Sequence, residues 1–228
     1  TDGEVHYQAI KNVTETYDTT ACTVIMDLTV EAEAFGCAIS MPEHEVPSVT
    51  GRLVCDEESV NRLQVPSLSA GRMPEYLKAN CLAVENIKDK AVLSGCIGPF
   101  SLAGRLYDMS EIMVGIYIEP DVIKTLLDKC TEYITLYCKE LKAIGATGVI
   151  MAEPAAGLLS NEDCLEYSTV YVKQIVEAVQ DDNFTVVLHN CGNKGHCTQA
   201  MIDSGAAALH FGNAVNMVET LEQCPSNL

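Results

Sequence analysis

Two residues that could bind a metal follow a short apolar stretch of the chain. His189 and Cys191 come after residues 185–188, and Gly192 and Asn193 follow them. The apolar run predicts a buried strand, and the Gly-Asn pair predicts the turn that ends it. Because residues i and i+2 of a strand point the same way, the imidazole and the thiol would face one side, as a donor set suited to zinc. The alternative is a core cysteine beside a satisfied buried histidine, which is the more frequent origin of an isolated H-x-C pair.

Polar residues also stand at the ends of four other candidate strands. They are Asp27 after residues 22–26, Arg105 at the end of the turn and helix that follow residues 91–96, Glu153 after residues 147–152, and His210 at the end of residues 206–210. In a parallel sheet or barrel, the carboxyl ends of the strands meet at the edge where active sites are built. This shared placement favours a functional interpretation of the His189 and Cys191 pair. For each charged residue the alternative is a solvated charge at the rim.

Strand patterns alternate with helix patterns along the whole chain. Helices are predicted at residues 4–18, 72–87, 120–144, 160–179 and 197–203, while residues 30–35 look mixed and residues 37–54 predict a hairpin or an excursion over the rim. Such alternation is typical of βαβ units and a parallel sheet. We therefore expect one α/β domain over residues 1–228.

Composition excludes several classes of protein. The net charge of −18 over 228 residues, with no Lys/Arg run, argues against nucleic acid or an anionic membrane as the main partner. No apolar segment is long enough to span a bilayer and the first residues lack a signal-peptide pattern, so a cytoplasmic location is expected. The 11 cysteines are scattered, which favours reduced thiols in a reducing or anaerobic compartment over a disulfide framework.

Four motifs in order resemble the uroporphyrinogen decarboxylase superfamily, and within it the methylcobamide:coenzyme M methyltransferase branch. They are MDLTVEAEAFGC at residues 26–37, GPFSLA at 98–103, AEP at 152–154 and LHNCG at 188–192. The resemblance spans nearly the whole chain, and the H-x-C-G motif is its most specific part.

The resemblance implies a (β/α)8 TIM barrel, of which this chain would hold about strands 2–6. It also implies a zinc ion bound by His189, Cys191 and a distant cysteine expected beyond Leu228. The zinc activates a small thiol such as coenzyme M, which takes a methyl group from a methylated corrinoid carried on a separate corrinoid protein. His210 stands near the place of an acidic residue that can reach the metal in these methyltransferases, and an imidazole can substitute for it.

Under this hypothesis three further residues have supporting roles. Asp27 and Glu153 would orient a ligand or substrate, and Arg105 would contact an acidic group on the thiol. One alternative is a decarboxylase acting on a tetrapyrrole, since Asp27 matches the catalytic aspartate of those enzymes by position, although Arg105 stands where they carry a tyrosine. A second alternative is a truncated barrel that is non-catalytic or serves as a corrinoid-binding module. A homodimer that completes the barrel is left open.

Overall fold

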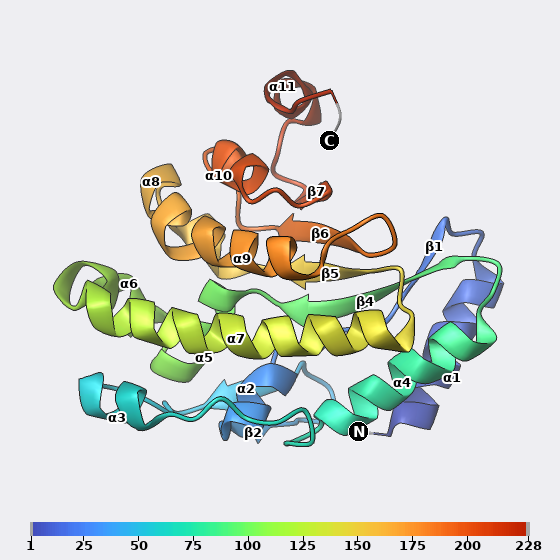
Figure 1. Cartoon of the computed structure of the whole chain (residues 1–228), viewed down its shortest axis with the longest axis horizontal. Coiled ribbons are helices and arrows are strands. Elements are labelled where there is room, and N and C mark those ends of the chain that lie inside the picture. Colours follow the sequence, from blue (N-terminus) through green and yellow to red (C-terminus); the bar gives the residue numbers. More distant parts are fainter. Residues whose placement is uncertain (1, 227–228) are drawn as a thin grey trace.

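A five-stranded parallel sheet forms the centre of the computed structural model, which describes residues 2–226 (Figure 1). Its strands, in spatial order, are β1 (Ala21–Thr23), β4 (Ala91–Ile97), β5 (Gly148–Ala152), β6 (Thr185–Asn190) and β7 (Ala208–Phe211). The spatial order follows the chain order and every neighbouring pair is parallel. All five carboxyl ends therefore lie at one edge, which confirms the predicted partial barrel.

Helices connect the strands and cover one face of the sheet. α7 (Pro120–Ile144) joins β4 to β5, and α9 (Val170–Val179) precedes β6; the two lie side by side in front of the sheet in Figure 1. Alternate residues of β6 are buried beneath these helices, whereas Thr185, Val187 and His189 on the other face are half-buried. His189 therefore faces the side of the sheet that would be the barrel interior.

The remaining helices frame the sheet. Along the chain they are α1 (Gly3–Thr16), α2 (Val30–Phe35), α3 (Glu57–Arg62), α4 (Met73–Asn86), α5 (Pro99–Tyr107), α6 (Met109–Ile118), α8 (Asn161–Cys164), a π-helical turn η2 (Leu165–Thr169), α10 (Thr198–Asp203) and α11 (Met217–Gln223). A 3₁₀ turn, η1 (Pro154–Leu158), follows β5. An antiparallel hairpin, β2 (Ala38–Ser40) with β3 (Ser48–Thr50), lies within residues 37–54. Within residues 2–226, no helix is long and apolar enough to cross a membrane.

Local sequence signals explain where the prediction succeeded. α7 has the predicted limits because Pro120 occupies its first turn and Gly145 ends it with a left-handed φ of 101°. Residues 30–35, taken as mixed, are helical in α2, and Gly36 ends that helix in the same way with a φ of 111°. The predictions contain no helix at α3, α6 or α11.

The first strand is shorter than the apolar run at residues 22–26 suggested. β1 ends at Thr23, and the chain then passes so close over β4 that a Cβ on Gly95 would lie 2.8 Å from the Cβ of Met26. The carboxyl-terminal half of β4 therefore has no strand partner on the β1 side.

Candidate functional site

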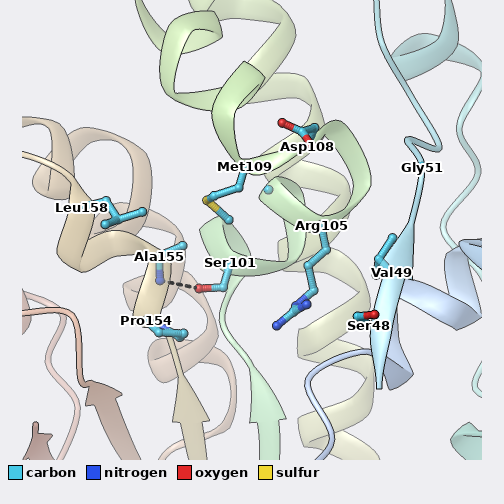
Figure 2. A pocket seen from close by; sticks show the side chains of 11 residues that line it. Ser48, Val49, Gly51, Ser101, Arg105, Asp108, Met109, Pro154, Ala155 and Leu158 are labelled. Carbon is cyan, nitrogen blue, oxygen red and sulfur yellow. Dashed lines mark hydrogen bonds between the residues drawn. The ribbon is translucent and has the colours of Figure 1, made fainter. Parts of the chain in front are cut away.

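A pocket of about 410 Å³ opens at the carboxyl edge of β4 and β5 (Figure 2). It is bounded by α5, the β3 strand of the hairpin and η1, and its lining residues are Ser48, Val49, Gly51, Ser101, Gly104, Arg105, Asp108, Met109, Pro154, Ala155 and Leu158. Figure 2 shows the Arg105 side chain extending from α5 into the space between Ser48 and Ser101. The predicted site residue Arg105 thus lines a pocket large enough for a small molecule.

Arg105 has a charge without a protein partner. Its guanidinium makes no hydrogen bond or ion pair within residues 2–226, although the residue is half-buried. Burial lowers the pKa of Arg105, while the charges of Glu31 and Asp27 raise it. A planar guanidinium of this kind can bind a carboxylate, sulfonate or phosphate with two parallel hydrogen bonds. The pocket is therefore suited to the anionic end of a ligand.

Glu153 lies beneath the pocket and holds its wall in place. Its carboxylate is only 1% exposed and accepts hydrogen bonds from the backbone N–H groups of Phe100 at 2.7 Å and Ser101 at 2.8 Å, and from the Ser168 hydroxyl at 3.1 Å. Burial raises the pKa of Glu153, against the lowering effect of the hydrogen bonds from Ser101 and Phe100. The side chain thus caps the first turn of α5, the helix that carries Arg105.

Two further contacts fix the same helix start. A Cβ on Gly98 would lie 2.5 Å from the Glu153 carboxyl carbon, so only glycine fits before Pro99 in the GPFSLA motif. The Ser101 hydroxyl accepts a hydrogen bond from the Ala155 backbone N–H at 3.1 Å, which ties α5 to η1 (Figure 2). These contacts give the pocket a rigid floor.

The predicted metal ligands lie at the ends of the next two strands. His189 pairs with His210 in the sheet register, and their ring centroids are 4.7 Å apart with an interplanar angle of 35°. The His189 Nδ1 is buried and has no hydrogen-bond partner in the part of the chain that the structure describes. Burial lowers the pKa of His189, and the charge of His210 lowers it further. Cys191 is exposed in the turn after β6, and its thiol is free.

Glycine backbones join the turn after β6, which carries Cys191, to the pocket. A Cβ on Gly192 would lie 2.5 Å from the Pro154 carbonyl oxygen, and one on Gly157 would lie 2.2 Å from the Gly192 carbonyl carbon. A Cβ on Gly212, in the turn after β7, would lie 2.7 Å from the Cys191 carbonyl oxygen. The turns after β5, β6 and β7 therefore pack backbone against backbone, which explains the glycine of H-x-C-G.

Asp27 is held in an ion-pair cluster at the end of the first strand. Its Oδ2 accepts a hydrogen bond from Arg72 Nη1 at 2.5 Å, and its Oδ1 accepts from the Thr29 backbone N–H at 2.9 Å and hydroxyl at 2.7 Å. Arg72 also forms an ion pair with Glu33. Burial acts to raise the pKa of Asp27, but the hydrogen bonds from Arg72 and Thr29 bring it below its ordinary value.

Sequence reasoning missed two residues of this region, Arg72 and Glu31. Arg72 stands at the predicted start of a helix, where nothing local identifies its partners. Glu31 lies in α2 with an exposed fraction of 3%, which the mixed pattern of residues 30–35 did not suggest. Asp27, Glu31 and Glu33 lie close together in the sequence, and nothing in the pattern indicates which of these acids is buried.

The residues that could hold a metal form only part of a site. His189 and Cys191 supply the imidazole and thiol that zinc binds, on one turn and its strand. Among residues 2–226, no group of three His, Cys, Asp or Glu side chains is arranged to hold a metal ion, so His210 does not complete such a group there. The third ligand expected beyond Leu228 lies outside the described residues.

Comparisons with known proteins identify the family and agree with the fold. A family model described as uroporphyrinogen decarboxylase (URO-D) matches residues 2–227. The methylcobamide:CoM methyltransferase MtbA of Methanosarcina mazei is 31% identical over 201 residues, which are 86% of this chain and 59% of that protein. A uroporphyrinogen decarboxylase of Legionella pneumophila is 24% identical over 85% of this chain and 56% of its own length. A solved methyltransferase structure from Methanosarcina mazei has a TM-score of 0.84 at 27% identity, covering 92% of this chain and 62% of that one.

Proposed function

The chain belongs to the uroporphyrinogen decarboxylase (URO-D) family, and from this we propose that the whole protein transfers a methyl group from a methylated corrinoid protein to a small anionic thiol such as coenzyme M. The chain spans 59% of the length of the MtbA relative, whose name describes this reaction. One observation carries the proposal: the unpaired guanidinium of Arg105 lines a pocket at the same sheet edge as His189 and Cys191. An anionic thiol needs both a cation and a means of forming its thiolate.

Arg105 would bind the anionic end of the thiol. Coenzyme M carries a sulfonate, which the guanidinium can hold with charge-assisted hydrogen bonds. Apolar groups such as Val49, Met109 and Leu158 also line the pocket and would contact the hydrocarbon part of the ligand. Binding at this point orients the other end of the ligand, whose thiol must then reach the neighbouring strand ends.

His189 and Cys191 would hold a zinc ion, together with at least one ligand from outside residues 2–226. The unpartnered Nδ1 of His189 and the free thiol of Cys191 support this assignment. When bound, zinc lowers the pKa of a coordinated thiol and stabilises its thiolate, the reactive nucleophile. The His210 ring lies beside the His189 ring at a tilt of 35° and would restrain its orientation.

Asp27 and Glu153 would act as positioning residues. Glu153 accepts hydrogen bonds from the first turn of α5 and so sets the position of Arg105. Asp27 is tied to Arg72 at the end of β1. Neither carboxylate lines the pocket, so the proposed reaction gives neither of them a proton transfer.

A decarboxylase acting on a tetrapyrrole is the second candidate, favoured by the match to the Legionella pneumophila enzyme. The third is a barrel without catalysis that binds a corrinoid. To separate the three, the full-length protein is incubated with methylcobalamin and coenzyme M, and separately with uroporphyrinogen. Formation of methylated coenzyme M supports the proposal, whereas carbon dioxide release from uroporphyrinogen without methyl transfer, or neither product, overturns it.

A further inference from the structure

Glu31 is a buried carboxyl group that the proposed reaction does not use. Its Oε1 accepts a hydrogen bond from the backbone N–H of Ile97 at 3.0 Å. Its Oε2 is also buried and has no hydrogen-bond partner anywhere in residues 2–226. A carboxylate with one unpartnered buried oxygen is unfavourable in its ionised form, and protonation relieves that cost.

The position of Glu31 links it to the anion pocket. Ile97 is the last residue of β4, in the half of that strand that β1 leaves unpaired. The Glu31 carboxyl replaces the missing strand partner at this point. Gly98 follows, and α5 then carries Arg105 into the pocket while α2 packs against α5.

The charges of Glu31 and Arg105 influence each other. The pKa of Glu31 is raised to about 7. Burial is the main cause, and the charge of Asp27 adds to it, while the hydrogen bond from Ile97 and the charge of Arg105 act to lower the pKa. The charge of Glu31, in turn, raises the pKa of Arg105 against the effect of burial. Glu31 therefore changes its charge close to neutral pH, on the helix α2 that packs against the helix carrying Arg105.

Among residues 2–226, the tyrosines and the cysteine whose pKa responds to the charge of Glu31 titrate at higher pH. The other groups whose pKa responds to Glu31 are Tyr76, Cys96, Tyr133 and Tyr137, and the pKa of each is raised above its usual range. Burial raises the pKa of Cys37 to about 11, against the lowering effect of the Arg105 charge. Asp27 has a lowered pKa and, like Glu33, is paired with Arg72. Glu31 is thus the group of this cluster that titrates near neutrality.

We propose that Glu31 is a positioning residue of the anion pocket, which takes up a proton from solvent when an anion binds at Arg105. Ionised Glu31 neutralises part of the Arg105 charge and repels an incoming anion, whereas the protonated acid does neither. Because the anion favours the protonated form, its affinity falls as the pH rises through the titration of Glu31. The inference rests on the proposed assignment of the Arg105 pocket to the anionic end of the substrate.

The test is calorimetric titration of the full-length protein with ethanesulfonate, which has no thiol and does not titrate near neutral pH. If the bound anion raises the pKa of Glu31 by about one unit, the Kd for ethanesulfonate rises about tenfold from pH 5.5 to pH 8.5. Near neutral pH, the binding enthalpy is measured in two buffers of different ionisation enthalpy. The difference between the two values gives the number of protons taken up, and we expect about half a proton per anion.

Substitutions assign the proton to its group. Glu31→Gln keeps the acceptor for Ile97, and it abolishes the proton uptake and makes the Kd independent of pH. Glu33→Gln, on the same helix, is the matched control and keeps the pH dependence of the natural protein. Because proton uptake is measured on the natural protein, the inference can be tested even if a variant does not fold.

Two kinds of failure are distinguishable. If Arg105→Met binds ethanesulfonate as well as the natural protein does, or if neither binds it, the pocket assignment falls and the inference falls with it. If binding depends on Arg105 but its affinity is the same throughout the pH range, or Glu31→Gln retains the proton uptake, the inference about Glu31 is overturned and the pocket assignment stands.

Discussion

Gly157 and Gly192 meet backbone to backbone, so that a Cβ built on Gly157 would lie 2.2 Å from the Gly192 carbonyl carbon. The first glycine belongs to η1, beside the pocket that holds Arg105, and the second follows Cys191. The contact joins the pocket lined by Arg105 to the turn that carries Cys191. Under the proposed function, this contact would set the distance between the anionic end of the thiol at Arg105 and the side chains of His189 and Cys191.

The first prediction concerns this contact. Gly192→Ala places a Cβ against the Pro154 carbonyl oxygen, and we expect it to lower the free energy of unfolding by about 2 kcal/mol and to move the Cys191 turn. Urea denaturation and methyl transfer rates measure the two effects. Gly205→Asn is the control, because a Cβ on Gly205 would meet only Val176 Cγ1 at an ordinary contact distance of 3.8 Å, and its φ of 74° is close to the left-handed region that asparagine adopts. A Gly192→Ala protein with unchanged stability and rate would show that the close packing is not needed.

The second prediction concerns the stability cost of burying Glu31. The pKa of Glu31 is about 7 in the folded protein, against an ordinary value near 4.5. The folded protein therefore favours the protonated acid, and this contribution to the free energy of unfolding is complete below pH 4.5 and is lost as the pH rises through 7. Relative to Glu31→Gln, the natural protein should lose about 3 kcal/mol of unfolding free energy between these pH values. Urea denaturation at pH 4.5 and pH 8 measures this difference, and parallel pH profiles of the two proteins would contradict it.

The third prediction concerns the Arg72 cluster. Arg72→Met leaves Asp27 and Glu33 without their cation, and we expect the free energy of unfolding at pH 7 to fall by about 3 kcal/mol. Arg72 helps to keep the pKa of Asp27 below its ordinary value. The destabilisation caused by Arg72→Met should therefore become smaller as the pH falls through the pKa that Asp27 has in the folded protein.

Arg62→Met is the matched control, because Arg62 forms an exposed ion pair with Glu58. It should change the stability by less than about 0.5 kcal/mol. Equal effects of the two substitutions would mean that the Arg72 cluster contributes no more than a surface pair.

The fourth prediction concerns the metal. His189→Ala or Cys191→Ser removes one of the proposed zinc ligands, so the zinc content of the purified full-length protein should fall to about a tenth or less. His44→Ala is the control, because His44 lies exposed in the hairpin loop and should leave the zinc content unchanged. The metal is measured by atomic emission, together with circular dichroism to verify folding. Zinc that is retained in both site variants would assign the metal to other residues.

The sequence could predict which residues reach the carboxyl edge but not what each one contacts there. His189, His210 and Arg105 follow apolar runs, and a parallel sheet brings such positions together whatever the details of packing. The partner of Asp27 lies 45 residues further along, and that of Glu153 lies about 50 residues earlier, so no local pattern indicates either contact.

Short elements were the other limit of the prediction. α2 has only six residues, which is too few for helical periodicity to be recognised. The apolar run at residues 22–26 predicted a strand, but Ile25 and Met26 leave the sheet because Met26 crosses over Gly95. Glu31 lies in this short helix and contacts Ile97 of β4, 66 residues further along, so neither its burial nor this contact could be predicted.

The most direct test of the proposed function compares two thiols in single-turnover methyl transfer from a methylated corrinoid protein. The acceptors are 2-mercaptoethanesulfonate and the uncharged 2-mercaptoethanol, and the proteins are the natural one and Arg105→Met, with Arg52→Met as a control at an exposed arginine. The natural protein and the control should prefer the sulfonate by about a hundredfold, since a charge-assisted bidentate contact contributes about 3 kcal/mol, and Arg105→Met should lose that preference. Absence of methyl transfer to either thiol, or an unchanged preference in Arg105→Met, would contradict the account.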